Sequence, residues 1–307
     1  MATAATLSPT PATHGLPETS NQVSPSQQTI QVPRGPVTAE LSFYGAPADG
    51  SKPFNYVENP PAGQPKSNVR TEINTVQIED LRGREGNFTL DHNAFEALAN
   101  IESSIKPTEL TSLTDEQIRS TYYPEVEKLL LSNVPGANRI LLFDHTIRRA
   151  DPAAHRAPVL RVHVDQTPKS AEQRVRHHIP DENEAEALLS RRYRIINVWR
   201  PLNAEPVVSY PLAVADSASV RDEDLIGVEH RYPTRTGETA GVRHNPDQQW
   251  YYWSGMTGAE RLLLKCFDSD DEFGRWGRVP HTAFVDPRTP ENAPARESIE
   301  VRALVFG

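Results

Sequence analysis

The chain has 307 residues, a length that suits one large domain or two ordinary ones. Its single Cys excludes a disulfide framework and any multi-cysteine zinc site, and its 32 Lys and Arg against 41 Asp and Glu, a formal net charge of −9, argue against a nucleic-acid partner. No apolar stretch approaches the ~20 residues that cross a bilayer, and no basic-then-apolar leader opens the chain, so we expect no membrane segment and a cytoplasmic location.

The first 36 residues differ in composition from the rest of the chain. They hold six prolines among Ser, Thr, Gln and Ala, which offer too little apolar surface to offset the entropy of ordering. We therefore predict a disordered tail over residues 1–36 and a single domain over residues 37–307. The domain opens with an apolar stretch at 41–44, and a segment rich in Pro, Gly and Asn at 46–68 predicts a long extended arm.

Helical signals are concentrated between residues 91 and 133. Phe95, Leu98 and Ile101 follow a 3.6-residue period. The run Thr114–Gln117 resembles a capping box at the start of a further helix. We predict two or three helices here, packed on one outer face of the domain.

Downstream, the pattern changes to short strands separated by turn residues, with one helical insertion at about 180–192. Nine such runs without a fixed repeat predict a mainly β fold with some α, a jelly roll of two facing antiparallel sheets. The predicted strands are Arg139–Phe143, Val159–Val164, Arg194–Trp199, Val208–Ala215, Gly227–Tyr232, Gln249–Trp253, Arg261–Phe267, Thr282–Val285 and Ser298–Phe306.

A His-x-Asp motif lies at the end of the predicted strand 159–164. Alternation along a strand puts His163 and Asp165 on one face, opposite the apolar side chains. His281 lies 118 residues later, at the start of a strand that a jelly roll can bring alongside. Two His and one carboxylate on one face form the facial triad typical of non-haem Fe(II) oxygenases. The alternative is that these histidines lie on the surface or are satisfied in the core.

The C-terminal strand carries residue types that bind a keto-acid cosubstrate. Arg296 and Ser298 share a face and could bind a carboxylate through a bidentate ion pair and a hydrogen bond. Arg302 lies on the same face, because six positions is an even separation, so the choice between the two arginines stays open. The neighbouring hydroxyl of Ser298 favours Arg296.

Further residues have both a functional and a structural interpretation. For His145 we expect a structural hydrogen bond, for the pair His177–His178 a position in solvent, and for Cys266 a buried apolar site. Aromatic strand residues could line a substrate pocket, although aromatic side chains on strands often belong to the core. The candidates for the pocket wall are Trp199, Arg200, Trp250, Tyr251 and Tyr252.

Seven blocks, in order along residues 40–307, carry a resemblance to a known family. They are Asp49–Tyr56, Phe143–Arg149, Val162–Pro168, Ile196–Leu202, Gln249–Tyr252, Pro280–Phe284 and Arg296–Arg302. Together they resemble the asaB hydroxylase/desaturase family of fungal secondary metabolism, which is related to gibberellin desaturase and to an oxygenase of citrinin biosynthesis.

The resemblance implies an Fe(II)/2-oxoglutarate-dependent oxygenase on the double-stranded β-helix form of the jelly roll. His163, Asp165 and His281 would hold Fe(II), and 2-oxoglutarate would be the cosubstrate. The family acts on small metabolites such as polyketides, terpenoids or alkaloids, by hydroxylation or desaturation; neither this choice nor the oligomeric state follows from the sequence. The alternative is a non-catalytic jelly-roll binding or accessory protein of the same pathway, against which the intact triad and Arg296 argue.

Overall fold

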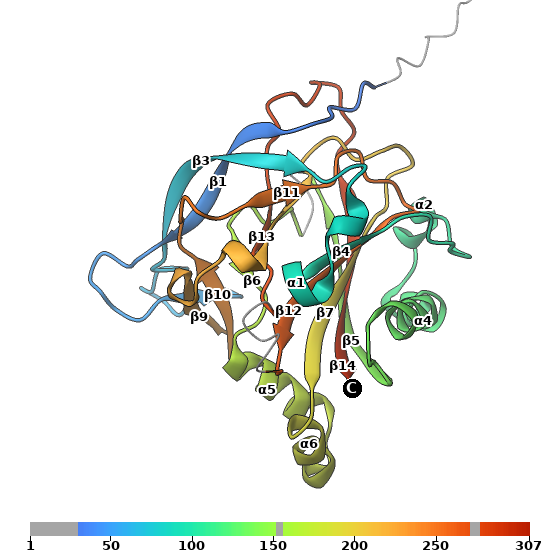
Figure 1. Ribbon diagram of the computed structural model, residues 1–307. Helices are drawn as coiled ribbons and strands as arrows, with labels where there is room; N and C mark the ends of the chain where they lie inside the picture. Colours follow the sequence, from blue (N-terminus) through green and yellow to red (C-terminus); the bar gives the residue numbers. More distant parts are fainter. Residues whose placement is uncertain (1–29, 152–155, 271–276) are drawn as a thin grey trace, which may run out of the picture. The chain divides into compact units, whose positions relative to one another are not determined.

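Two β-sheets with a hydrophobic core between them make up the folded unit of residues 31–307 (Figure 1). The computed structural model describes residues 30–151, 156–270 and 277–307. Val164 of one sheet and Leu264 of the other belong to the same cluster of buried side chains. The unit is therefore mainly β with some helices, and its two curled sheets have the jelly-roll arrangement predicted from the sequence.

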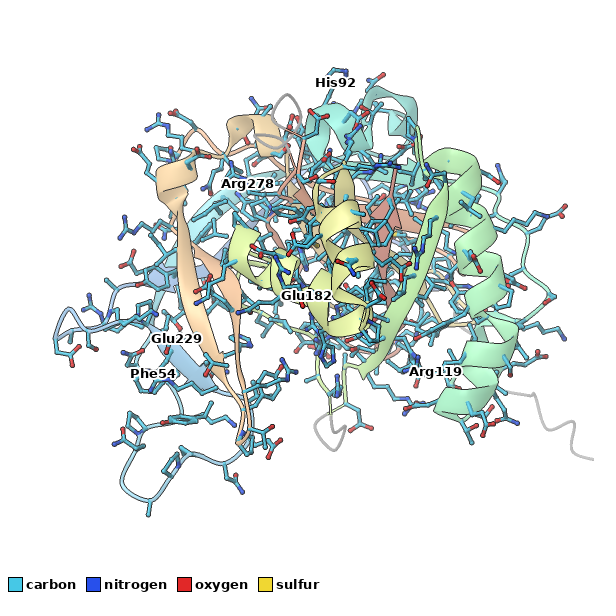
Figure 2. All side chains as sticks on the ribbon, turned by 90° about the horizontal axis from the view of Figure 1, so that it is seen from below. Phe54, His92, Arg119, Glu182, Glu229 and Arg278 are labelled. Atoms are coloured by element: carbon cyan, nitrogen blue, oxygen red, sulfur yellow. The ribbon has the colours of Figure 1, made fainter. Side chains whose placement is uncertain are left out.

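The larger sheet carries the His-x-Asp motif and His281. Neighbouring strands are antiparallel except for two pairs, β3 with β11 and β2 with β9. At one edge Phe54 lies opposite Glu229, as Figure 2 shows. From edge to edge the strands are β1 (Val37–Gly45), β3 (Arg70–Asp80), β11 (Trp250–Tyr252), β8 (Leu212–Ala215), β13 (His281–Ala283), β6 (His163–Val164), β10 (Thr236–Val242), β9 (Leu225–Arg231) and β2 (Phe54–Tyr56).

The smaller sheet is buried on both faces. One face lines the core between the sheets, and on the other Ile299 and Val301 share a hydrophobic cluster with Val126 and Leu130 of a helix. The strands are, in order, β4 (Phe95–Leu98), β12 (Arg261–Asp268), β7 (Tyr193–Pro201), β14 (Glu297–Phe306) and β5 (Arg139–Arg149). The helices are α1 (Leu90–Asn93), α2 (Pro107–Leu110), α3 (Asp115–Thr121), α4 (Tyr123–Asn133), α5 (Pro168–His178) and α6 (Glu182–Leu189).

None of the helices in the described ranges has the length and apolar character needed to cross a membrane.

The predicted helical region contains a strand directly after its first short helix, α1. Residues 95–98 form β4, in which Phe95 and Ala97 are buried and the intervening side chains are less so, and β4 pairs with β12. A segment of only four residues is too short for its apolar spacing to distinguish a helix from a strand, and pairing with the sheet makes this one a strand. The predicted capping box is confirmed at the start of α3, where the side chain of Thr114 accepts from the backbone N–H of Gln117.

Three elements arise from segments without a strong apolar period. Strands β3 and β10 were not predicted, and each is stabilised by pairing along its length with a neighbouring antiparallel strand. The charged segment that contains His177–His178 belongs to α5, whose buried side chains include Ala171 and Val175. The predicted strand 159–164 is regular only over its last two residues, as β6.

Residues 34–36, which composition assigned to the tail, make specific contacts with the folded unit. The guanidinium of Arg34 donates to the carbonyl oxygen of Ser254, and that of Arg288 donates to the carbonyl oxygens of residues 34–36. The folded unit therefore begins earlier than predicted. Residues 1–29 of the predicted tail lie outside the described residues.

We expect deletion of residues 1–36 to lower the melting temperature by a few degrees, and deletion of residues 1–29 to leave it near that of the full chain. The longer deletion removes several hydrogen bonds, each worth about 0.5–1.5 kcal/mol. Thermal unfolding of the three proteins, followed by circular dichroism, measures the difference. Equal melting temperatures would show that the contacts of residues 34–36 contribute nothing to stability.

Candidate metal centre

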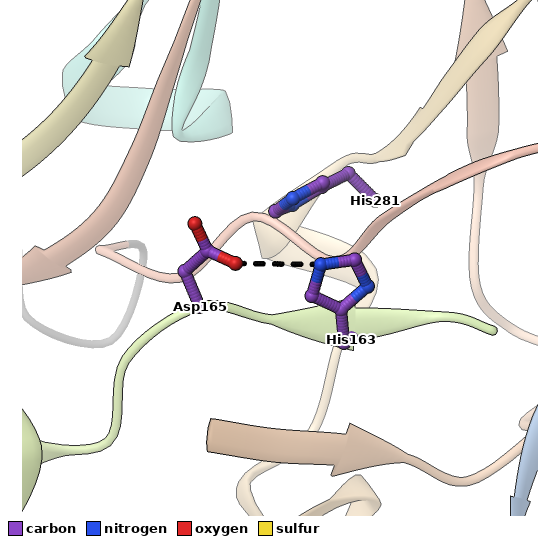
Figure 3. Close-up of side chains that lie close together, drawn as sticks. All are labelled: His163, Asp165 and His281. Atoms are coloured by element: carbon purple, nitrogen blue, oxygen red, sulfur yellow. Dashed lines mark ion pairs between the residues drawn. The ribbon is translucent and has the colours of Figure 1, made fainter. Parts of the chain in front are cut away.

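His163, Asp165 and His281 lie together at neighbouring strands of the larger sheet (Figure 3). Strands β6 and β13 are antiparallel neighbours, and His163 is paired with His281 across them. Asp165 follows His163 by two residues and therefore projects to the same side. One possible ligand atom from each residue lies within 4.8 Å of the others. The pairing of the two strands thus brings together residues that are 118 positions apart.

Backbone carbonyls determine which ring nitrogens face the centre. Nδ1 of His163 lies 2.9 Å from the carbonyl oxygen of Arg161, and Nδ1 of His281 lies 3.0 Å from that of Val279. Because a carbonyl oxygen can only accept, each Nδ1 carries the proton. Each Nε2 therefore presents its lone pair to the centre, as a metal ligand requires.

The carboxylate of Asp165 is held by two donors on one of its oxygens. Oδ2 accepts from Nδ2 of Asn197 at 2.8 Å and from Nε of Arg302 at 3.1 Å. Oδ1 lies 3.3 Å from Nε2 of His163. Oδ1 is therefore the oxygen available to a metal, and the three residues offer two nitrogens and one oxygen from one side, with the opposite coordination positions left open.

The protonation states of this centre suit a divalent metal. Burial of Asp165 would raise its pKa, but the charge of Arg302 and the smaller influences of His163 and His281 together outweigh burial and hold the pKa well below its usual range. Burial lowers the pKa of His281, and the neighbouring His163 lowers it further. At neutral pH the carboxyl is ionised and His281 is neutral, which are the forms that bind metal ions.

The guanidinium of Arg302 donates hydrogen bonds to three carboxylates. Its Nε donates to Asp165, its Nη1 donates to Asp144 at 3.0 Å, and its Nη2 donates to Glu300 at 2.5 Å. Every nitrogen of the guanidinium therefore has an anionic partner. The position of Arg302 makes it a support for Asp165, the carboxylate of the triad.

Arg296, immediately before β14, is buried and only partly satisfied. Its Nη1 donates to the carbonyl oxygen of Tyr210 at 2.6 Å, and its guanidinium lies 5.7 Å from the ring centre of Trp199. Among the described residues, its Nε has no hydrogen-bond acceptor. Burial lowers the pKa of Arg296 to about 9, and the charge of Arg148 acts in the same direction. An anionic ligand would stabilise this desolvated cation by accepting a hydrogen bond from its unused donor.

A cavity of about 30 Å³ connects Arg296 to the triad. All three triad residues line it, and so do Arg296 and Arg302. Ser298 is buried on the same face of β14 but is not among the lining residues. Further lining residues are Arg148, Val159, Trp199, Leu212, Thr282, Ala283 and Glu300.

Of the five residues predicted for the pocket wall, the structure brings Trp199 to this cavity. Arg200 points to the helical side of the smaller sheet, where it donates to the carbonyl oxygens of Gly258 and Ile105. The remaining three, which belong to or pack against the main hydrophobic core and line no part of the cavity, are Trp250, Tyr251 and Tyr252.

Two residues of the centre were missed by the sequence analysis. Asn197 is a fully buried amide in the apolar strand β7, and Glu300 is a buried carboxylate in β14. A polar side chain at an inward position of an otherwise apolar strand is the signal that could have identified both, because such groups are buried only with partners.

The other histidines singled out from the sequence lie outside the centre. Nδ1 of His145 is 3.0 Å from the hydroxyl of Tyr123, a structural hydrogen bond. His178 does not face solvent as predicted: its ring stacks on Phe143 at 5.1 Å between centres, and its Nε2 is buried without a hydrogen-bond partner among the described residues. Burial, followed by the influence of His177, lowers the pKa of His178 to about 4.

We expect the stability to fall as the pH is lowered from about 6.5 to about 4, in part through His178. The unfolded chain binds a proton at this residue near pH 6.5 and the folded protein only near 4, so protonation in this window favours unfolding. His178→Phe preserves an aromatic ring next to Phe143 but cannot titrate. Melting temperatures of both proteins across this window should show a shallower fall for the variant; identical slopes would contradict the assignment.

Comparisons with known proteins agree with this centre. A family model described as Oxidoreductase/YMDC permease-like domain matches residues 41–306. The chain is 36% identical over 301 residues to the hydroxylase/desaturase poxK of Penicillium oxalicum, covering 89% of this chain and 92% of poxK. The chain belongs to this hydroxylase/desaturase family. It is also 31% identical to the alpha-ketoglutarate-dependent dioxygenase phiK of a fungal species, covering 90% of this chain and 98% of phiK.

The chain is also similar to a protein of known structure. A variant of the iron and alpha-ketoglutarate-dependent endoperoxidase NvfI matches it with a TM-score of 0.81 and 28% identity, covering 91% of this chain and 99% of that chain. This hydroxylase/desaturase is therefore an enzyme, an Fe(II)/2-oxoglutarate-dependent oxygenase that acts on a small molecule. The family, the enzyme class and the two cofactors implied by the sequence resemblance are confirmed.

Proposed function

We propose that this oxygenase hydroxylates or desaturates a polyketide, terpenoid or alkaloid on a double-stranded β-helix that its N-terminal helices cover on one face. In this proposal, His163, Asp165 and His281 hold Fe(II), and Arg296 binds the distal carboxylate of 2-oxoglutarate. When bound, Fe(II) and 2-oxoglutarate supply the oxidation of a C–H bond by dioxygen, with release of succinate and CO2. The observation that carries the proposal is the buried Arg296, with its unused Nε, in a cavity that the triad also lines.

The assignment of Arg296 rather than Arg302 rests on their partners. Arg302 already donates to three carboxylates, so binding a fourth would require it to release one of them. Arg296 has a backbone carbonyl as its partner and gains a charge-assisted bond when a carboxylate arrives. The hydroxyl of Ser298, two residues along the same face, is the group we assign to the second carboxylate oxygen.

Two residues of the chain act through Asp165. Asn197 and Arg302 occupy Oδ2, which keeps Oδ1 directed toward the metal and prevents rotation of the carboxylate. Tyr210 adopts a left-handed backbone conformation with φ of 47°, and its carbonyl oxygen orients Arg296. These contacts preorganise the ligands on both sides of the cavity.

The direct test is succinate formation from 2-oxoglutarate. We expect the wild-type protein to release succinate only when Fe(II) and dioxygen are both present, at a low rate without the organic substrate. His281→Ala, which removes one metal ligand, should release none. Succinate release that does not depend on Fe(II) would overturn the proposal.

A further inference from the structure

A second cavity, of about 280 Å³, opens beside the metal ligand Asp165. Residues of α5 and of the hairpin of β9 and β10 line it. Helix α5 packs against β10 (Figure 1). Asp165 lines both this cavity and the smaller one at Arg296. The space is therefore adjacent to the position where the metal would act. Its polar lining includes Gln166, Gln173, Arg174, His230, Arg235 and Thr239.

Arg174 is a half-buried cation in the lining of this cavity. Its guanidinium lies 5.3 Å from the ring centre of Phe143. Across the described ranges of the chain, neither a hydrogen bond nor an ion pair engages this guanidinium. Burial lowers the pKa of Arg174, and Asp144 only partly offsets this. A half-buried cation without an ion-pair partner is stabilised when an anionic ligand group binds to it.

The other charged groups of the cavity do not neutralise Arg174. Arg235 lies over the ring of Tyr232 at 3.8 Å and adds a second cation. The one further carboxylate of the lining, Glu238, accepts a hydrogen bond from the hydroxyl of Thr167 at 2.6 Å. Asp165 is paired with Arg302. Among the described residues, Arg174 and Arg235 therefore have no ion-pair partner, and either can accept an anionic group of a bound molecule.

We infer that this cavity is the substrate site and that Arg174 pairs with an acidic group of the substrate, so the substrate is a small organic anion such as a carboxylate. This inference rests on the proposed function, because it assumes that oxidation takes place at the metal beside Asp165. An acid group bound at Arg174 fixes one end of the substrate and leaves the rest of the molecule in the space that reaches Asp165. Placement of this kind determines which C–H bond is oxidised.

The helix that carries Arg174 also provides a matched control. Arg176 lies two residues further along α5, is exposed, and pairs with Glu172 and Glu186. Arg174→Ala and Arg176→Ala remove the same charge from the same helix, but only the first changes the cavity. Arg174→Lys retains the charge and tests whether charge alone is sufficient.

The probes are 2-naphthoate and its neutral amide, 2-naphthamide, added to the anaerobic protein with Fe(II) and saturating 2-oxoglutarate, so that the cosubstrate already occupies Arg296. Enhanced NMR relaxation of the probe protons by Fe(II) reports binding near the metal. We expect wild-type protein to bind the carboxylate at least about ten-fold more tightly than the amide. Arg174→Ala should remove this preference by weakening the binding of 2-naphthoate and not that of 2-naphthamide. Arg174→Lys should retain part of the preference, and Arg176→Ala should retain all of it.

Equal affinity for the two probes in wild-type protein, binding of neither, or a preference that survives Arg174→Ala would overturn the inference. The visible charge-transfer absorption of Fe(II)-bound 2-oxoglutarate, recorded on the same samples, separates the two claims. If the absorption is present and the probe preference absent, the substrate assignment fails while the proposed function stands. If the absorption is absent from wild-type protein, the proposed function fails and the inference fails with it.

Discussion

Asp165→Ala is expected to lower Fe(II) affinity by about 100-fold or more and to abolish turnover. The substitution removes the only carboxylate of the triad and leaves two neutral imidazoles, which hold a divalent cation poorly. It also deprives Arg302 and Asn197 of their shared acceptor. Anaerobic calorimetric titration of Fe(II) into wild-type and variant protein measures the change in affinity.

Asp144→Ala is the control for this experiment. Asp144 also accepts from Arg302, at 3.0 Å, but it is not a member of the triad. We expect this variant to bind Fe(II) within a few-fold of wild-type affinity. The melting temperature of both variants shows that the comparison is made on folded protein. An Asp165→Ala protein that binds Fe(II) as tightly as Asp144→Ala would remove Asp165 from the triad.

Arg296→Ala is expected to weaken 2-oxoglutarate binding by about ten-fold or more and to leave Fe(II) affinity unchanged. A charge-assisted hydrogen bond to a desolvated carboxylate is worth about 1.5–3 kcal/mol, and this variant loses it. Among the described residues, the guanidinium of Arg296 donates to the carbonyl oxygen of Tyr210 and to no residue of the triad. Anaerobic titration of 2-oxoglutarate into the Fe(II)-loaded protein gives the dissociation constant.

Arg302→Ala should show the opposite pattern. This variant withdraws a donor from Asp165, so its main effect falls on Fe(II) affinity, by about 10- to 100-fold. Each variant is thus the control for the other. A loss of 2-oxoglutarate affinity in Arg302→Ala at full Fe(II) occupancy, with none in Arg296→Ala, would exchange the roles assigned to the two arginines.

The triad was predictable because its geometry follows from a local rule. His163 and Asp165 share a strand face by alternation, and His281 begins another strand, so a jelly roll needs only one strand pairing to complete the set. The roles of Arg296 and Arg302 were not predictable in this way. By alternation along the chain the two arginines share one face, and they differ in their partners: Asp165 and Asp144, which come from elsewhere in the chain, accept hydrogen bonds from Arg302.

In the fold, too, features set by local sequence were predictable and features set by distant partners were not. Strands with apolar alternation, such as β7 and β14, were located within one or two residues. Strand β10 consists largely of Thr, Gly and Glu, and it exists because β9 and β6 pair with it. Pairing partners are a tertiary property, and β-propensity reflects them more than it reflects the sequence of one strand.

The most direct test of the central claim is an anaerobic visible spectrum of the wild-type protein. The account predicts a charge-transfer absorption when 2-oxoglutarate is added to the Fe(II)-loaded protein, none with either component alone, and loss of the absorption in His281→Ala. A wild-type protein that binds Fe(II) but develops no absorption at saturating 2-oxoglutarate would contradict the claim that the triad and Arg296 form one site.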